Sequence, residues 1–185
     1  MDRREGPVPQ SIPAVVLIHQ EGVIAAIALV GLWFASDGLG ASLAPRGPAA
    51  AVILLGFAAG LVCALVFWLL RRLPALTDLE RWQRGMVRGW SLTDAGAVAV
   101  FSGLAEEALI RALLQPVLGL LPAALLFAVL HIVPDRKLWM WPVLALALGV
   151  ALGWIFEIGG YPAAASAHVA INAFALIRLR GGAAE

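Results

Sequence analysis

The feature that most constrains this chain is an apolar stretch, from Phe101 to Pro116, that carries three ionisable side chains in its interior: Glu106, Glu107 and Arg111. Each charged side chain near the centre of a bilayer costs roughly 2.5 to 3.5 kcal/mol on insertion scales, so three cost on the order of 8 to 10 kcal/mol. A segment that only anchors a protein in a membrane has no reason to carry that cost. The stretch therefore predicts a functional site in an apolar environment.

Spacing within this stretch separates the roles of the two acids. Glu107 and Arg111 are four residues apart, so on a helix they lie one above the other, with the acid on the N-terminal side. Glu106 is turned about 100° away from Glu107 and has no basic residue three or four positions further on. We therefore predict that Arg111 neutralises Glu107 in a supporting pair, which leaves Glu106 as a candidate general base.

Two later apolar segments carry polar side chains that could complete such a site. Phe127 precedes His131 by four residues, which places an imidazole one turn after an aromatic ring that can pack beside it. His168 precedes Asn172 by four residues, so an imidazole and an amide share one helical face. Together the two segments supply two histidines and an amide donor for a polar cavity inside the membrane.

The composition indicates an integral membrane protein. Of the 185 residues, 62% are hydrophobic and 14% are charged, and the mean hydropathy is +0.90. A soluble domain of this length could not bury so much apolar surface. The single cysteine, Cys63, excludes an internal disulfide, and neither zinc-ribbon spacing nor a basic stripe for nucleic acid occurs. We predict an all-α polytopic membrane helix bundle, with residues 1–185 forming one integral membrane domain.

Six apolar segments are predicted to be transmembrane helices. Their approximate ranges are 14–36, 49–70, 91–116, 117–133, 138–156 and 162–180. The third begins with a capping box, from Ser91 to Asp94. The fourth is short if counted from Pro122, so it is expected either to begin earlier, near Val117, or to be partly shielded by its neighbours. The fifth contains Gly149 and Gly153, a small-xxx-small pattern that lets helices approach closely.

A polar segment between the second and third predicted spans indicates a helix of a different kind. It begins with a second apparent capping box, from Thr77 to Glu80. An apolar stripe and a basic stripe follow it, and their members are Leu79, Trp82, Met86 and Trp90, and Arg81, Arg84 and Arg88. We predict a cytoplasmic interfacial amphipathic helix; a solvated linker is the alternative, because Gly85 and Gly89 weaken helix formation.

The basic residues predict the orientation of the chain. With the N-terminus inside, nearly all of them are cytoplasmic: Arg3, Arg4, Arg71, Arg72, Arg81, Arg84, Arg88, Arg136, Lys137, Arg178 and Arg180. Arg46 alone lies in an outside loop, and Arg111 is within a span. We therefore predict a multi-pass protein of the inner or plasma membrane with both termini cytoplasmic. An alanine-, glycine- and arginine-rich composition with one lysine suggests a bacterial source.

The polar motifs resemble those of the CPBP family of intramembrane proteases, which includes the CAAX prenyl endopeptidases and bacteriocin-processing or Abi proteins. Glu106-Glu107-x-x-x-Arg111, Phe127-x-x-x-His131 and His168-x-x-x-Asn172 occur in the same order, and the similarity covers roughly residues 93–179 as a catalytic core. The resemblance implies endopeptidase activity on a membrane-associated peptide or protein, with water held and deprotonated by Glu106 and His131. His168 and Asn172 would then donate hydrogen bonds to the oxyanion.

The resemblance leaves the involvement of a metal open. Glu106, His131 and His168 are a possible ligand set for zinc with an open fourth position, whereas a metal-free glutamate mechanism is also argued for the family. The sequence has no HExxH helix and no Gly-x-Ser-x-Gly elbow, and Cys63 has no histidine near it. Serine and cysteine mechanisms are therefore not favoured.

Other functions are compatible with these residues. Intramembrane carboxylates, an arginine and histidines also serve proton-coupled transporters, although no inverted repeat or pair of broken helices is apparent. A non-catalytic binding or immunity protein of the same family is a third possibility. His131 and Asn172, taken singly, could be structural polar residues between helices. Membrane lipid and a peptide or protein substrate are the expected partners, and nucleic acid is not.

The remaining polar residues are given structural roles. His19 and Glu21 are predicted to be interfacial, near the inner start of the first span. Asp94 is predicted to cap a helix and Ser166 to be a small packing residue. Glu157 is predicted to be solvated at the outer interface, with a contact to substrate as the alternative.

Overall fold

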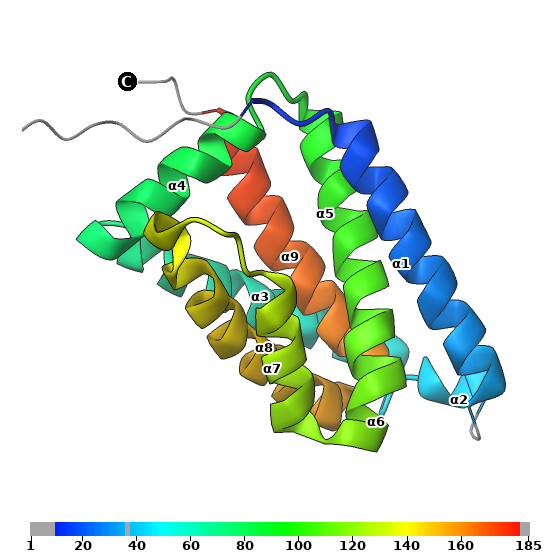
Figure 1. Cartoon of the computed structure of the whole chain (residues 1–185). Helices are drawn as coiled ribbons and strands as arrows, with labels where there is room; N and C mark the ends of the chain where they lie inside the picture. Colours follow the sequence, from blue (N-terminus) through cyan, green and yellow to red (C-terminus); the bar gives the residue numbers. More distant parts are fainter. Residues whose placement is uncertain (1–9, 36–37, 182–185) are drawn as a thin grey trace, which may run out of the picture.

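The computed structural model describes residues 10–35 and 38–181, and this part of the chain is an all-α bundle (Figure 1). The elements are α1 (Ala14–Phe34), α2 (Gly38–Ser42), α3 (Ala49–Leu70), α4 (Pro74–Met86), α5 (Leu92–Glu107), the π-helix η1 (Ala108–Leu114), α6 (Gln115–Leu118), α7 (Leu120–Leu130), the 3₁₀-helix η2 (Arg136–Leu138), α8 (Met140–Gly159) and α9 (Tyr161–Arg180). The predicted all-α membrane bundle is confirmed.

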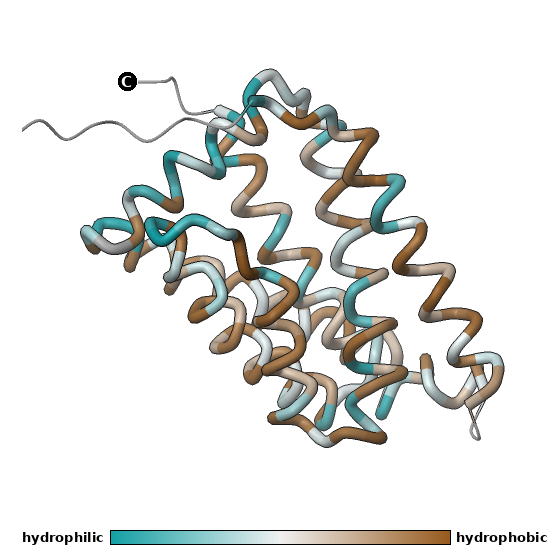
Figure 2. Tube along the Cα trace, viewed as in Figure 1, coloured by the Kyte–Doolittle hydropathy of each residue, from teal (hydrophilic) through white to brown (hydrophobic). Residues whose placement is uncertain are grey.

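The predicted number of six spans differs from what the structure provides. Within the described residues, four helical segments are long and apolar enough to cross a membrane: α1, α3, residues 136–159 and α9. Residues 92–118, which carry the three ionisable side chains, are divided among α5, η1 and α6. Helix α7 has 11 residues, and at 1.5 Å per residue such a helix covers only about half of a ~30 Å hydrocarbon layer. Figure 2 shows the long helices as largely hydrophobic, with hydrophilic residues gathered around α4.

Helix α9 packs against both α3 and α5 (Figure 1), and small residues allow the close approach. A Cβ atom added to Gly60 of α3 would overlap the main chain of Ala167, and one added to Gly103 of α5 would lie 2.8 Å from the amide nitrogen of Val169. Close backbone approach is the usual basis of helix association in membranes. This packing holds the middle of α9, with His168 in it, directly against α5.

The glycine pattern of the fifth predicted span serves helix packing as expected. A Cβ added to Gly149 of α8 would lie 3.2 Å from the carbonyl oxygen of Ala124 in α7. One turn further on, a Cβ at Gly153 would lie 3.0 Å from Leu120 and 3.1 Å from Gln115 Oε1. The two glycines therefore bring α8 against α7 and against the residue at which α6 begins.

Helix α4 is amphipathic as predicted, but its predicted capping box is wrong. The helix begins at Pro74, and the Thr77 hydroxyl donates to the Pro74 carbonyl at 2.8 Å instead of capping the helix. Proline suits this first turn because its missing N–H has no intrahelical partner there. The capping box predicted at the start of α5 is confirmed: Ser91 Oγ accepts from the Asp94 amide at 3.0 Å, and Asp94 Oδ2 accepts from the Ser91 amide at 2.9 Å.

The first described residues and the end of α9 lie at the same end of the bundle. The Ile12 amide donates to the Met86 carbonyl at 3.0 Å, and the start of α1 shares an apolar cluster with Leu179. The cytoplasmic location of both termini stays a prediction. Arg3 and Arg4 lie outside the described residues.

Candidate active site

The two adjacent glutamates lie where α5 changes into a π-helix. Glu107 is the last residue of α5, and η1 begins at Ala108. Tyr161, the first residue of α9, donates its hydroxyl to the Leu104 carbonyl at 3.1 Å in this same turn. The sequence pattern predicted regular α-helix throughout this segment. π-helical segments within helices are rare and occur frequently at functional sites.

Glu107 is the centre of a fully buried ion pair. Arg111 Nε donates to Glu107 Oε2 at 3.2 Å, and both side chains have 0% exposure. The expected pair is therefore present despite the change in helix type. The other oxygen, Glu107 Oε1, accepts a hydrogen bond from His168 Nδ1 at 2.9 Å. Glu107 thus joins η1 to α9 as well as neutralising Arg111. The contact with His168 could not be predicted from spacing.

His168 lies between the two glutamates. Its Nδ1 is occupied by Glu107, and its Nε2 lies 4.0 Å from Glu106 Oε2. The His168 side chain is 3% exposed, whereas that of Glu106 is 20% exposed. Glu106 is therefore the acid that faces open space, and Glu107 orients the imidazole beside it. The fixed tautomer that results resembles the way catalytic histidines are held by a carboxylate.

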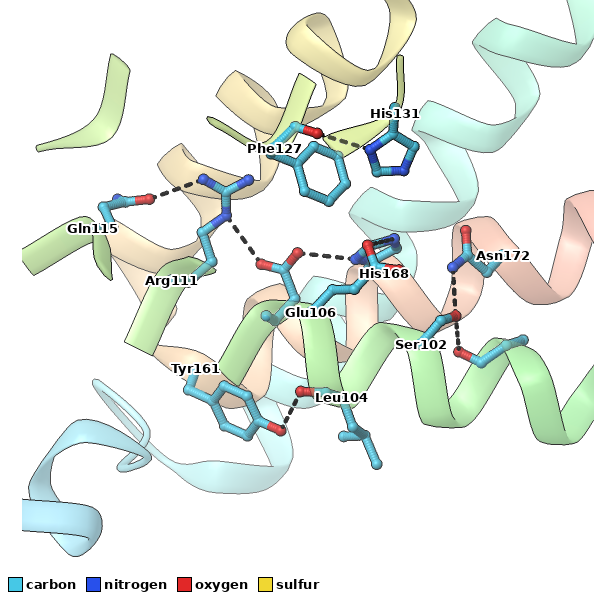
Figure 3. A network of polar contacts seen from close by, with 12 residues as sticks. Ser102, Leu104, Glu106, Arg111, Gln115, Phe127, His131, Tyr161, His168 and Asn172 are labelled. Carbon is cyan, nitrogen blue, oxygen red and sulfur yellow. Dashed lines mark hydrogen bonds and ion pairs between the residues drawn. The ribbon is translucent and has the colours of Figure 1, made fainter. Parts of the chain in front are cut away.

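His131 is held at the C-terminal end of α7 by its own helix. Its Nδ1 lies 2.8 Å from the Phe127 carbonyl oxygen, which can only accept, so Nδ1 is the donor and Nε2 is left as an acceptor in the neutral ring. Ring centroids are 4.5 Å apart for His131 and Phe127 and 5.9 Å apart for His131 and Trp141. The Phe127 ring also lies 5.8 Å from that of His168, and it stands between Arg111 and His131 (Figure 3).

Asn172 is joined to α5 by a residue that the sequence interpretation missed. Its Nδ2 donates to Ser102 Oγ at 2.8 Å, and Ser102 Oγ donates to the Ala99 carbonyl at 3.4 Å (Figure 3). Ser102 is a buried polar residue one turn before Glu106. A polar residue four positions before the candidate base, on the same face of an apolar helix, was the sequence feature that could have indicated it.

One cavity brings the predicted residues together. It has a volume of about 540 Å³ and reaches from the polar residues near α4 to the middle of the bundle. Its polar wall includes all four candidate catalytic residues, Glu106, His131, His168 and Asn172. Most of the remaining wall is apolar, with Phe67, Trp68, Leu144, Leu148 and Phe174 among its residues. The cavity therefore combines a polar group suited to acid-base chemistry with space for an apolar segment.

The prediction that Glu21 is interfacial is wrong. This residue of α1 is 6% exposed and lines the same cavity, and its Oε2 has no hydrogen-bond partner among the residues that the structure describes. His19, two positions earlier, is exposed, and its Nδ1 lies 2.7 Å from the Val15 carbonyl oxygen. Sequence position placed both residues near a membrane surface. The packing of α1 against α5 buries the side of the helix that carries Glu21.

A series of hydrogen bonds between polar side chains continues from Arg111 to the surface of the bundle that lies away from α4. Arg111 Nη1 donates to Gln115 Oε1 at 3.2 Å, and Gln115 Nε2 donates to Glu157 Oε1 at 2.8 Å. Glu157 is half exposed, as predicted, and forms an ion pair of 3.1 Å with Arg46. Gln115, one turn after Arg111, was not recognised as part of the site. The chain of contacts fixes the end of the candidate site that lies away from α4.

An ion-pair cluster stands at the α4 end of the cavity. Glu80 Oε1 accepts from Arg84 at 2.7 Å and from Arg178 at 2.8 Å. Partial burial acts to raise the pKa of Glu80, but the hydrogen bonds and charges of Arg84 and Arg178 outweigh it and hold the pKa below its ordinary value. The cluster joins α4 to the last turn of α9.

The fold and the cavity define a membrane helix bundle with a buried polar site. Residues 88–174 match the family model described as Type II CAAX prenyl endopeptidase Rce1-like, and this segment contains all three motifs. Over this segment, close to half of its length, the chain is therefore similar to the Rce1-like CAAX proteases, and the resemblance seen in the motifs is confirmed. Comparisons with curated proteins and with solved structures gave no match.

Proposed function

We propose that the protein is an intramembrane endopeptidase that hydrolyses a peptide bond in a membrane-associated peptide or protein. The observation that carries this proposal is the joint position of Glu106, His131, His168 and Asn172 in the wall of one largely apolar cavity. Similarity to a protease family supports the same reaction class. Such a cavity can take up an apolar segment of polypeptide from the membrane and exclude bulk water from the reaction.

In this mechanism Glu106 is the general base. A water molecule can bond to Glu106 and to the free Nε2 of His131, which orients it for attack. As its oxygen bonds to the scissile carbonyl carbon, one proton passes to Glu106. That proton is then delivered to the leaving amine nitrogen as the carbon–nitrogen bond breaks, so that a carboxylic acid and an amine are released. The second proton of the water stays on the new carboxyl group.

The oxyanion of the intermediate would be stabilised by His168 and Asn172. Asn172 Nδ2 uses one of its two hydrogens for Ser102 and keeps the other for the substrate. His168 can donate from Nε2 when it is protonated, and the Glu107 carboxylate at Nδ1 stabilises that imidazolium. Removing one oxyanion donor typically costs about 100- to 1000-fold in kcat.

A bound divalent metal, with zinc as the first candidate, is a separate prediction. Its ligands would be Glu106, His131 and His168, and the Nδ1 contacts of both histidines are of the kind that orients metal-binding imidazoles. Within residues 10–35 and 38–181, however, no three His, Cys, Asp or Glu side chains lie close enough together to hold an ion. A metal site would therefore require these side chains to move, and the mechanism above is written for water alone.

The test is cleavage of candidate peptides from a native membrane fraction by the purified protein in detergent. Wild type is compared with Glu106→Gln and His131→Ala, each with and without a chelator. His19→Ala is the matched control for the histidine, because His19 is exposed and outside the cavity. We expect cleavage to be lost in both site variants and retained in the control. Cleavage by a folded Glu106→Gln protein would refute the assignment of the base.

The same experiment separates the alternatives. Loss of activity on chelation, with recovery on adding zinc, would establish the metal prediction. No cleavage by folded wild type, together with proton-coupled flux that depends on Glu106, would indicate a transporter. Absence of both activities would indicate a binding or immunity protein of the same family. The proposed location is a bacterial inner or plasma membrane with both termini cytoplasmic, which labelling of cysteines introduced at either end can test.

A further inference from the structure

The inference concerns Glu21, a carboxylate in the cavity wall that the mechanism does not use. It comes from α1, which precedes the segment matched by the family model. Its side chain is more than nine-tenths buried and lines the cavity together with Gln20 and Ser102. Its Oε2 makes no hydrogen bond to any residue in the described part of the chain.

Every other carboxylate in the cavity wall or beside it has a cationic or imidazole neighbour. Glu107 is paired with Arg111 and His168, and Glu80 is paired with Arg84 and Arg178. Glu106 faces His168 Nε2 at 4.0 Å. Glu21 lies within electrostatic range of Glu106 and His168, but no salt bridge reaches it within the described ranges. An unpaired buried carboxylate is costly, so its presence in a cavity wall indicates a partner that arrives with the ligand.

We propose that Glu21 binds a positively charged group of the substrate, the ammonium of a lysine or the guanidinium of an arginine, and so determines which peptide bond is presented to Glu106. This proposal rests on the proposed function. The chemistry is that of a carboxylate accepting a charge-assisted hydrogen bond, which is about twice as strong as a neutral one. Since Glu21 and Glu106 share one cavity, the cation would lie a short distance along the peptide from the scissile bond.

The position of Glu21 also suits this role. The two arginines of the cavity wall already have partners: Arg178 pairs with Glu80, and Arg71 donates to the Trp68 carbonyl. A substrate cation therefore meets no competing internal partner at Glu21. The apolar residues on either side of it, Leu17 and Ile24, can cover the methylene groups of a long basic side chain. The preferred substrate is thus a largely apolar segment that contains one basic residue.

The experiment uses labelled alanine–leucine peptides of 12 residues in detergent micelles, each with a single lysine moved along the sequence. Each is matched by a peptide with norleucine in place of the lysine. Cleavage is measured as kcat/KM, and binding is measured with versions in which every backbone amide near the lysine is N-methylated and resists hydrolysis. We expect wild type to prefer the lysine peptides at one position by about 10- to 100-fold, the range expected for a charged hydrogen bond.

Glu21→Gln is expected to abolish this preference while cleavage of the norleucine peptides is retained. Asp78→Asn is the control, because Asp78 lies outside the cavity and pairs only with Arg81 at the surface among the described residues, and it should keep the preference. The melting temperature of Glu21→Gln should be unchanged or higher, since Glu21 Oε2 makes no hydrogen bond to the described residues that the substitution would remove. A lysine preference that persists in Glu21→Gln overturns the proposal. Equal losses for both peptides overturn it too, because they indicate a structural or proton-transfer role.

The binding measurement separates this inference from the proposed function. Binding that prefers lysine through Glu21, without any cleavage, would support the inference as a cation site and refute the endopeptidase. Glu106-dependent cleavage with no preference between lysine and norleucine would support the endopeptidase and refute the inference.

Discussion

Replacing Arg111 by methionine is the most direct test of the buried network that supports the site. Methionine keeps most of the length and the helix propensity of arginine but removes the charge and the donors. Arg111 has 0% exposure and makes three contacts: to Glu107 Oε2 at 3.2 Å, to Gln115 Oε1 at 3.2 Å, and to the Phe127 ring at 5.6 Å from its centroid. All three are lost in the variant.

The expected cost follows from these contacts. A hydrogen bond to a charged partner contributes about 2 kcal/mol and one to a neutral partner about 1 kcal/mol. A cation–π contact that is shielded from water contributes about 1 kcal/mol. The sum of about 4 kcal/mol agrees with the 3–5 kcal/mol typical of breaking one side of a buried ion pair. It corresponds to a change of about 1000-fold in the ratio of folded to unfolded protein.

The measurement is unfolding of the detergent-solubilised protein by SDS, followed by the fluorescence of its seven tryptophans. Arg88→Met is the control, because Arg88 is exposed, and it should change the stability by no more than about 0.5 kcal/mol. The double variant with Glu107→Gln should lose less than the two single losses added together, because the partner charge is then absent as well. A decrease in the free energy of unfolding below about 1 kcal/mol for Arg111→Met would refute the reasoning. The pair of Arg111 and Glu107 would then resemble the weak interhelical hydrogen bonds of other membrane proteins, which average about 0.6 kcal/mol.

Two further predictions concern the surroundings of the site. The pKa of Glu80 is lowered in the folded protein, so this residue contributes stability above its ordinary pKa of 4.5, and the contribution is lost as the pH falls through the lowered value. The melting temperatures of wild type and Glu80→Gln should therefore differ at pH 7 and converge as the pH is lowered through the acid range; a constant difference would contradict this. Gly60→Ala should lower the free energy of unfolding by about 1–3 kcal/mol, because the new methyl group meets the main chain of Ala167. Gly96→Ala, with open space around the glycine, should be neutral or slightly stabilising. Equal unfolding midpoints for the two variants would count against close packing of α3 on α9.

Much of the fold could be predicted because local sequence determines where these helices begin and end. Helix α3 has the predicted bounds, since Pro48 precedes an unbroken apolar run that stops at Arg71. The start of α5 was predicted from the reciprocal bonds of Ser91 and Asp94. Each motif pair of the site is separated by four residues, a spacing that places both members on one helical face. Their assembly into one cavity was expected only through the resemblance to a family.

The remainder depended on contacts between segments distant in sequence. Glu21 is near the start of an apolar span, where a charged residue is normally interfacial, and only the packing of α1 against α5 turns it into the cavity. The π-helix has no local sequence marker, and it packs against a segment that is distant in sequence. Gly31 of α1 lies so close to Leu113 of η1 that a Cβ added to the glycine would be 2.5 Å from the leucine side chain. The six predicted spans exceed the four long apolar helices of the described residues, because residues 92–118 are divided at Glu107 and Ala108 and α7 has only 11 residues.

Helix geometry and different partners explain how the neighbouring glutamates come to have different surroundings. On an α-helix, Glu106 and Glu107 point about 100° apart, so one of them can face a cavity while the other faces protein. Glu107 lies at the junction with η1 and uses both carboxylate oxygens for Arg111 and His168. Because that carboxylate is saturated, it is a poor acceptor for a proton from water. Glu106 keeps an accessible carboxylate oxygen beside the same imidazole, and the chemical difference between two identical side chains follows from their partners.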